Sequence, residues 1–506
     1  MKNKKLWTIL CIAVLLLQLA AEALTAVLVL KLNILPDKYT VVLLAVFALL
    51  GVLTGLLLFL HGKKPVGKVR RIIACVLALL IVCACALVAK VAADAYQTIN
   101  HMTEPDKSTS TRNMYVFVLE EDPAQRLEDT ADYTFAIVEN YDETHTQQAI
   151  AVIEEAIQTE ADIAGYEKTS DVADALLEQQ VGAAILNGVT VSLLMEEEGY
   201  ADFMDKVRIL YTIPLEQLEG STDVETVPDE TVDEMKDVTN SPFIVYIGGS
   251  DTRSSKLTDS RNDVNILVVV NPVTKQVLLL NTPRDYYIPN PAGDGKLDKL
   301  THCGGYGVEC SMEALSDLYD VDVDYFAQLN FTGFETLIDA VGGVTIYSSQ
   351  SFTTRDTTIK KGNNFLDGAS ALDLVRDRYH VSGGDNGRGK NQMKVITALI
   401  EKMTNGTTII SKYADILDSL EGMFKTSLTM DDISMLVKMQ LSDMASWNVQ
   451  SFAVTGTGGH EKTYSIPGQN AYVMYPNEDV VAYAGELVDR ILAGEILTED
   501  DMTVPQ

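Results

Sequence analysis

The stretch "VLLLNTPRDYYIPNP", residues 277–291, sets an arginine at the end of an apolar run that is typical of a buried strand. A guanidinium group stays charged and matches the oxygen geometry of phosphates, so Arg284 there is a candidate anion ligand. A single arginine in an acidic protein is more simply a surface ion-pair partner. The same part of the chain, however, also holds Arg253, Arg261, Lys299, Arg376, Arg378 and Arg388. As a set placed at strand ends and a helix start, these residues predict an anion site.

The spacing of these residues indicates which of them share a face. Arg376 and Arg378 are two residues apart and lie on one face if that segment is extended. Arg388 and Gln392 are four apart and lie on one face of a helix. The stretch "GGDNGRGKNQ", residues 383–392, is a glycine-rich turn entering that helix, and its backbone N–H groups are further candidate anion ligands.

Two aspartates accompany the basic residues. Asp251 follows the apolar run "FIVYI", and Asp263 precedes the next run, "ILVVV". If these two strands are antiparallel, both carboxylates lie at one edge of the sheet. Hard oxygen ligands beside arginines are what a Mg²⁺–pyrophosphate site requires. We therefore expect Asp251 and Asp263 to hold Mg²⁺, with Mn²⁺ as the alternative.

Two α/β domains are expected to carry these residues. Residues 242–495 alternate strands such as "QVLLLNT" with helical stretches such as "GFETLIDAV" and "NQMKVITALIEKM". Residues 113–214 alternate in the same way, and they contain no nucleophile–base pair or glycine-rich phosphate loop, so a structural or interactive role is expected. Residues 215–241 are acidic and broken by proline, which is typical of a linker.

Three apolar segments in residues 1–95 are each long enough to cross about 30 Å of hydrocarbon. They lie at about 6–30, 39–60 and 72–93. A cleaved signal peptide is the alternative for the first, but that run is too long and two more spans follow it. The basic flanks "MKNKK" and "HGKKPVGKVRR" place the N-terminus and the second loop in the cytoplasm. Three crossings then place everything after residue 95 outside the cell, beginning with a polar juxtamembrane linker at 95–112.

Charge is distributed unevenly between the two parts. Residues 1–94 hold 11 Lys/Arg against 3 Asp/Glu, and the remainder holds 28 against 68. An acidic extracellular part excludes nucleic acid as a partner, because phosphates need a basic face. Only Cys303 and Cys310 lie outside the apolar segments, and they are either a disulfide or two buried thiols.

The run "GGSDTR…RNDVNILVVVNPVTKQVLLLNTPRDYYI…LDKLTH…GFETLIDAVGGV…LDGASALDLVRDR…GDNGRGKNQ" resembles the LytR-CpsA-Psr family over about 150 residues. Three spans and an extra domain before the family domain resemble its CpsA-like branch. The resemblance implies a three-layer α-β-α catalytic domain with a central mixed sheet, preceded by a smaller α/β accessory domain. It also implies a cell-envelope phosphotransferase that uses Mg²⁺ to move a capsular or teichoic-acid-type glycopolymer from undecaprenyl diphosphate to peptidoglycan.

Carried onto this sequence position by position, the resemblance makes Asp251 and Asp263 the metal carboxylates. It assigns the pyrophosphate to Arg261, Arg284, Lys299, Arg376, Arg378, Arg388 and Gln392. The catalytic group that it implies comprises Arg284, Asp285, Arg376, Arg378 and Asp385. Family members often have arginine before the glutamine and threonine after the second aspartate, where this chain has Asn391 and Val264; Lys390 is a candidate for the missing charge.

The expected reaction needs a base for the attacking hydroxyl, and Asp285 and Asp263 are both candidates. Two other functions are compatible with the same residues. A hydrolase would use the same basic cluster with water as the attacking group. A membrane-anchored regulator or scaffold would bind the lipid-linked polymer without chemistry.

Overall fold

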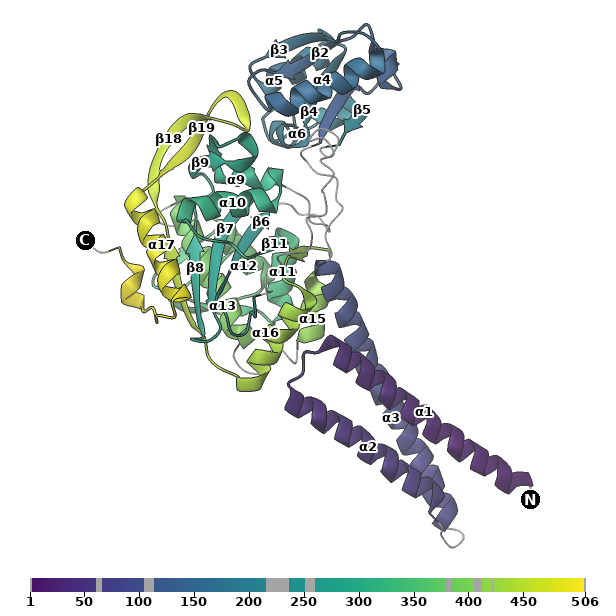
Figure 1. Ribbon diagram of the computed structural model, residues 1–506. Helices are drawn as coiled ribbons and strands as arrows, with labels where there is room; N and C mark the ends of the chain where they lie inside the picture. Colours follow the sequence, from purple (N-terminus) through teal and green to yellow (C-terminus); the bar gives the residue numbers. More distant parts are fainter. Residues whose placement is uncertain are drawn as a thin grey trace.

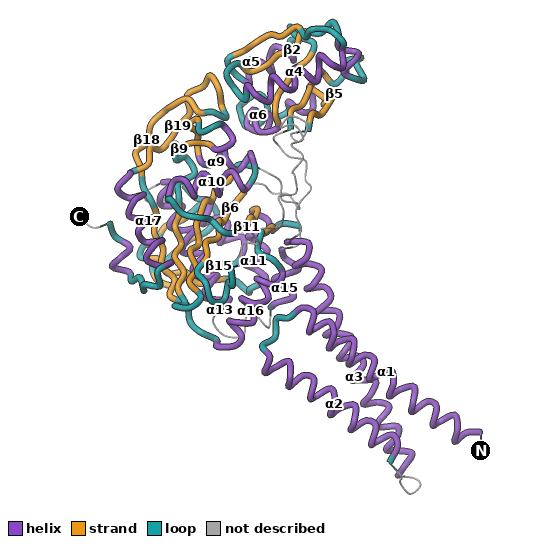
Figure 2. Tube along the Cα trace, in the orientation of Figure 1, coloured by secondary structure: helices purple, strands orange, loops and turns teal. Residues whose placement is uncertain are grey.

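The structure is a computed structural model that describes residues 2–60, 66–103, 113–214, 236–250, 260–378, 380, 384–404, 412–420 and 422–504. Three long helices extend from one end of the molecule, as Figure 1 shows. A small unit built on a five-stranded sheet lies at the other end, and a larger unit built on a six-stranded sheet lies between them. Figure 2 shows the strands gathered in these two units. The expected α/β class with three N-terminal apolar helices is confirmed.

The three N-terminal helices are α1 (Lys2–Leu32), α2 (Asp37–Phe59) and α3 (Val66–Thr103). Each is long and apolar enough to cross a membrane, with mean hydropathy of 2.3, 2.9 and 3.2 in the most apolar part. Most of their large apolar side chains are exposed, as expected for a surface that faces lipid. Helix α3 continues past the predicted end of the third span at residue 93. Residues 95–103 of the predicted linker are therefore helical, because Ile99 and Met102 are buried against the larger unit.

The C-terminal ends of α1 and α3 pack directly on the larger unit. Ile99 of α3 belongs to the same apolar cluster as Ile338 in α11 (Phe331–Ala340). Ser434 Oγ, in α16 (Met430–Asp443), donates a hydrogen bond to the Leu32 carbonyl at 3.0 Å. The N-terminal helices thus contact the larger unit through both apolar and polar groups.

The small unit has the strand order β3-β2-β4-β1-β5, with β1 antiparallel to β4 and β5 and with β2 parallel to β3 and β4. Its strands are β1 (Met114–Leu119), β2 (Thr134–Val138), β3 (Asp162–Tyr166), β4 (Ala183–Asn187) and β5 (Val207–Ile213). Its helices are η1 (Leu127–Thr130), α4 (Glu143–Ile157), α5 (Thr169–Leu177), α6 (Gly188–Leu194) and α7 (Phe203–Lys206).

The larger unit is built on a mixed sheet with the order β16-β11-β6-β7-β8-β17. Its strands are β6 (Phe243–Ser250), β7 (Asn262–Asn271), β8 (Gln276–Asn281), β11 (Tyr325–Asn330), β16 (Phe424–Thr426) and β17 (Asn448–Ala453). The neighbours β6, β7 and β8 are antiparallel, whereas β11 and β17 run parallel to β6 and β8. The antiparallel pairing on which the aspartate prediction depended is present, with Ser250 opposite Asn262.

Helices cover both faces of this sheet, which confirms three layers. Alternate residues of β7 point to opposite faces. Leu267 and Val269 pack in the cluster that contains α10 (Val308–Tyr319) and α17 (Glu478–Leu492). Ile266 and Val268 pack in the cluster that contains Met393 of α13 (Gly384–Thr404) and residues of α16.

Shorter elements surround the sheet. They are β9 (Tyr287–Asn290), η2 (Pro291–Gly293), β10 (Lys296–Lys299), α9 (Leu300–Cys303), η3 (Gly304–Tyr306), β12 (Val344–Ser348), β13 (Phe352–Thr353), β14 (Thr358–Ile359), β15 (Gly362–Leu366), α12 (Gly368–Arg376), α15 (Tyr413–Leu420), β18 (Gly456–Thr463), β19 (Ile466–Pro476) and η4 (Glu499–Met502). Strands β9 and β10 form a hairpin directly after Arg284, and β18 and β19 form a long two-stranded ribbon beside it.

Candidate active site

A cavity of about 320 Å³ lies where β7 begins and β8 ends. It is lined by Arg261, Asp263, Val264, Arg284, Phe331, Val375, Arg376, Arg378, Arg388 and Gln392. Its lining thus includes five arginines and one carboxylate. Positive charge gathered in a concave space, in a strongly acidic protein, favours an anionic ligand.

The fold explains why residues distant in sequence meet here. Because β7 and β8 are antiparallel neighbours, the start of one and the end of the other share an edge of the sheet. Asp263 enters the cavity from the start of β7, and Arg284 enters from the turn after β8. Helix α12 ends at Arg376, and the first turns of α13 supply Arg388 and Gln392. The predicted shared face of Arg388 and Gln392 is therefore confirmed.

Arg284 is the centre of a chain of alternating charges. It forms an ion pair with Asp263, and its Nε lies 3.7 Å from Asp285 Oδ1. Arg378 Nη2 lies 3.6 Å from the other oxygen of Asp263, and Lys299 Nζ lies 3.3 Å from Asp285 Oδ1. Three cations share two carboxylates, so the chain keeps a positive surplus for a ligand. Four of the five side chains are only 10–13% exposed, which limits screening by solvent.

Arg376 and Arg388 are two of the remaining three arginines of the cavity. The Arg376 guanidinium carbon lies 4.5 Å from the centre of the Phe331 ring, which is a cation–π contact. Arg388 is 4% exposed. Beside it, Gln392 Nε2 donates to the Val375 carbonyl at 3.2 Å and ties α13 to α12.

The approach of α13 to the sheet depends on a glycine. A methyl group at Gly389 would come within 2.4 Å of Asn281 Nδ2, at the end of β8. A larger residue would therefore displace either the Asn281 side chain or the first turns of α13. Because Arg388 is the preceding residue, Gly389 helps to keep that guanidinium in the cavity.

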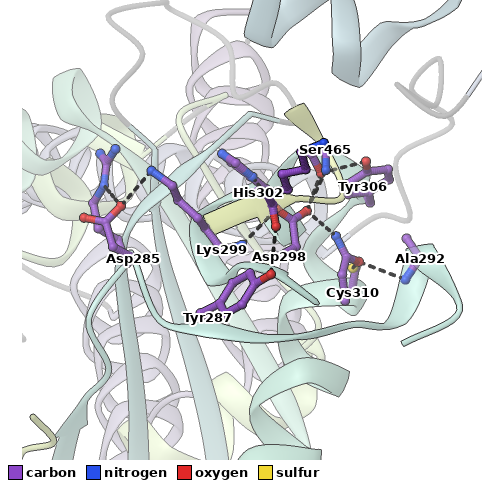
Figure 3. A network of polar contacts seen from close by, with 12 residues as sticks. Asp285, Tyr287, Ala292, Asp298, Lys299, His302, Tyr306, Cys310 and Ser465 are labelled. Carbon is purple, nitrogen blue, oxygen red and sulfur yellow. Dashed lines mark hydrogen bonds and ion pairs between the residues drawn. The ribbon is translucent and has the colours of Figure 1, made fainter. Parts of the chain in front are cut away.

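Lys299 is anchored by the residue before it. Figure 3 shows Lys299 directed at Asp285, while Asp298 turns the opposite way into a buried polar network. Asp298 accepts hydrogen bonds from His302 Nδ1 at 2.6 Å, Asn290 Nδ2 at 3.0 Å and the Ser465 hydroxyl. Burial by itself raises the pKa of Asp298, but the charge and hydrogen bond of His302 and the bonds from Ser465 and Asn290 outweigh it, so that pKa lies below its ordinary value.

Replacing Asp298 with alanine should lower the free energy of unfolding by about 3–5 kcal/mol, because several buried donors lose their acceptor. The folded-state pKa is depressed, so the contribution is complete above the unfolded-state pKa of about 3.9 and disappears as the pH falls through the folded-state value. Urea unfolding of the full-length protein in detergent measures the change. Asp317→Ala, an exposed position on α10, should stay within about 0.5 kcal/mol. A loss for Asp298→Ala as small as this control would contradict the role of the network.

An ion pair connects the small unit to the cavity. Glu196, just after α6, pairs with Arg261. A second contact lies deeper, where the Tyr141 and Tyr306 hydroxyls are 2.9 Å apart. Burial raises the pKa of both phenols, so both hydroxyls keep the proton that such a bond requires. The small unit therefore restrains one of the five arginines of the cavity.

Replacing Glu196 with alanine should lower the Kd for an anionic ligand of the cavity by up to about fivefold, because Arg261 loses a competing carboxylate. An exposed ion pair is worth at most about 1 kcal/mol, which sets this limit. Titration of the full-length protein with inorganic pyrophosphate measures the change, with Glu198→Ala, an exposed neighbour, as the matched control. A rise in the Kd would show instead that Glu196 positions Arg261 for binding.

The structure places the predicted residues unequally. Arg261, Asp263, Arg284, Arg376, Arg378, Arg388 and Gln392 line one cavity. Asp285 and Lys299 are not among the residues that line it. Asp285 lies beside Arg284, and Lys299 pairs with Asp285. Asp251 lies outside the described residues, and of Asp385 only the backbone, in the first turn of α13, is described. Cys303 and Cys310 are both free thiols and both buried.

Three residues of the site were not predicted from the sequence. Phe331 and Val375 form the apolar wall of the cavity, and both read simply as core residues of helices. Asp377, between two predicted arginines, accepts from His380 Nδ1 at 2.8 Å. The only sequence signal for this contact was the spacing of three residues between the aspartate and the histidine in "RDRYH", which is common in any turn.

Asp263 is the carboxylate through which the cavity would contact a metal ion. Among the described residues, no three His, Cys, Asp or Glu side chains cluster in a way that holds a metal by themselves. Mg²⁺ is commonly held by one or two carboxylates together with phosphate oxygens of a substrate. The donor set of this cavity therefore fits Mg²⁺ that arrives with, or is completed by, a phosphate ligand.

Comparison with known proteins identifies the family. The LytR_cpsA_psr family model matches residues 214–480, more than half of the chain. This chain belongs to the LytR-CpsA-Psr family. The matched region contains all the arginines of the cavity, and the small unit and the three apolar helices lie before it.

Two relatives and one solved structure illustrate the likeness. The polyisoprenyl-teichoic acid–peptidoglycan teichoic acid transferase TagU of Enterococcus faecalis is 32% identical over 219 residues, 43% of this chain and 71% of that protein. The Bacillus licheniformis protein of the same name is 35% identical over 203 residues, 40% and 65% of the two chains. The crystal structure of B. subtilis TagU is 26% identical, with a TM-score of 0.40 over 51% of this chain and 100% of that one.

Proposed function

We propose that this protein is a membrane-anchored extracellular transferase. It moves a glycopolymer of teichoic-acid or capsular type from a polyisoprenyl diphosphate, such as undecaprenyl diphosphate, onto peptidoglycan and releases the polyisoprenyl phosphate. The names of the relatives above support the reaction class. The observation that carries the proposal is the cavity lined by five arginines and Asp263, which matches the charge of a diphosphate.

Catalysis in this cavity rests on positioning and charge. Arg284, Arg376 and Arg388 bind the diphosphate oxygens, and Arg378 binds from the side of Asp263. As the bond between the bridging oxygen and the sugar-side phosphorus breaks, negative charge grows on the leaving phosphate. Guanidinium groups already fixed by ion pairs and ring contacts stabilise this charge without reorganising.

Mg²⁺ is the proposed cofactor, with Mn²⁺ as the alternative. Asp263 would hold it together with Asp251 and the phosphate oxygens of the donor. When bound, the ion would supply neutralisation of the negative charge on the donor phosphates. Arg284 keeps the Asp263 carboxylate oriented toward the cavity, because it forms an ion pair with that group.

The membrane helices support access to a donor that cannot leave the bilayer. Phe331 and Val375 line the cavity and belong to an apolar cluster that includes Leu32 of α1 and Ile99 of α3. The apolar wall of the cavity thus continues to the ends of the membrane helices. The basic residues before α1 and between α2 and α3 favour a cytoplasmic N-terminus, with the cavity outside the cell.

A product assay separates transfer from its rivals. The full-length protein in detergent is incubated with a polyisoprenyl diphosphate-linked glycopolymer labelled on the sugar-side phosphate, with and without peptidoglycan. We expect label joined covalently to peptidoglycan, and polyisoprenyl phosphate released in equal amount, only when peptidoglycan is present. Release at the same rate without peptidoglycan would identify a hydrolase. Donor binding with no product under either condition would identify a regulator or scaffold.

A further inference from the structure

A second cavity of about 610 Å³ adjoins the arginine-lined one and shares Arg376 and Arg378 with it. Its volume lies within the roughly 300–1,000 Å³ of typical ligand sites. The part of its lining that differs is rich in oxygen: Glu335, Asp356, Thr357, Ser370 and Asp373. Carboxylates of this kind accept hydrogen bonds from sugar hydroxyls, and the Thr and Ser hydroxyls can both accept and donate them. The shared arginines place any ligand of this cavity beside the proposed diphosphate.

The second cavity is also lined by a histidine that an aspartate orients. Asp377, 8% exposed, accepts from His380 Nδ1 at 2.8 Å. The His380 backbone N–H also points to the same oxygen, at 3.4 Å. A ring whose Nδ1–H donates to a carboxylate carries its lone pair on Nε2, which is then the proton acceptor. The His380 side chain is 52% exposed, so a ligand can reach it.

We propose that the second cavity binds the sugar of the acceptor and that His380 is the general base of the transfer. This inference rests on the function proposed above and assigns the acceptor side of that reaction. Nε2 of His380 takes the proton of the acceptor hydroxyl as its oxygen attacks the sugar-side phosphorus. A new phosphorus–oxygen bond forms to the acceptor, and the bond to the bridging oxygen breaks. Its electron pair leaves with the polyisoprenyl phosphate, and the proton passes from His380 to solvent.

His380 fits this role better than the two carboxylates expected from the sequence. Asp263 lines the arginine-lined cavity and not the second cavity, and it pairs with Arg284 and Arg378. Asp285 lines neither and pairs with Lys299. Both carboxylates thus balance the charges that bind the donor. His380 lies on the acceptor side of the shared arginines, and imidazole is the side chain best suited to accept a proton near neutral pH.

The test compares His380→Ala with wild type in the full-length protein. General bases contribute at least about 10²-fold, so kcat for transfer to peptidoglycan should fall about 100-fold. The Kd for a polyisoprenyl diphosphate should stay within about twofold, because no arginine is changed. Added imidazole should restore part of kcat. His460→Ala, an exposed histidine on β18, is the matched control and should keep wild-type kcat.

Asp377 acts here as a positioning residue. Asp377→Ala should lower kcat and leave the KM for the donor unchanged, because only the orientation of the ring is lost. Transfer by His380→Ala at the wild-type rate would overturn the assignment of the base, whereas wild type without acceptor-dependent transfer would overturn the proposed function itself. A normal kcat with a raised KM for peptidoglycan would show that His380 binds the acceptor without taking its proton, and would also overturn that assignment.

Discussion

Replacing Arg284 with alanine is expected to lower kcat/KM for transfer by about 10³-fold. The loss is large because Arg284 is the residue that links both carboxylates of the site. It lines the cavity, pairs with Asp263 and lies 3.7 Å from Asp285. Removal of one preorganised donor to a developing anion typically costs about 10²- to 10³-fold. The misplacement of Asp263 adds to this, so we expect the upper end of that range.

A second substitution separates charge from geometry at Arg284. Arg284→Lys keeps the charge but loses the planar fork, so it should recover only part of the rate. Arg126→Ala, whose side chain is 71% exposed on the small unit, is the matched control and should behave as wild type. Thermal unfolding of each variant excludes loss of folding as the cause. A folded Arg284→Ala protein that transfers polymer at the full rate would contradict the proposed diphosphate site.

Replacing Asp263 with asparagine is expected to lower kcat/KM between about 10²- and 10³-fold. Asparagine has nearly the same shape, but it offers Mg²⁺ no negative charge and offers Arg284 and Arg378 no ion pair. The Mg²⁺ concentration for half-maximal activity should rise at least about tenfold. Titration of activity with Mg²⁺ in wild type and variant measures both effects.

The Mg²⁺ titration also distinguishes two roles of Asp263. If the carboxylate only positioned arginines, activity would fall while the half-maximal Mg²⁺ concentration stayed the same. Asp317→Asn on α10, exposed and outside both cavities, controls for general loss of negative charge. An unchanged Mg²⁺ requirement in Asp263→Asn would therefore contradict the proposed metal contact but leave the arginine site standing.

The elements that carry the cavity were predictable because their apolar patterns are strong. The strand before Arg284 is fully buried, and the helices that carry Arg376 and Arg388 have apolar residues on their inner faces. The scarcity of arginine in an acidic chain then singled out the cluster, and the family resemblance gave its order. Seven of the predicted residues line one cavity for these reasons.

Other elements gave no comparable signal. Strand β11 is only partly buried, and the ribbon β18–β19 is rich in glycine and exposed polar residues, so neither has the alternation that predicts a strand. Ser465, which lies between β18 and β19, nonetheless donates a hydrogen bond to Asp298. The third apolar helix extends beyond its predicted span because Ile99 and Met102 find apolar partners in the larger unit.

The contacts between the two units could not be predicted from the sequence, because they join residues that are far apart along the chain. Tyr141 and Tyr306 are 165 residues apart, and no spacing rule connects them. Glu196 belongs to a unit with no chemical motif, yet it pairs with Arg261 of the cavity. The small unit, expected to be structural or interactive, thus contacts the site that the larger unit builds.

The most direct test of the account is a structure of the full-length protein with a polyisoprenyl diphosphate bound. We predict that the diphosphate lies between Arg284, Arg376 and Arg388, with the first isoprene units against Phe331 and Val375. A diphosphate bound elsewhere on the protein, with Arg284 still paired with Asp263 and Arg376 still over the Phe331 ring, would contradict the central claim.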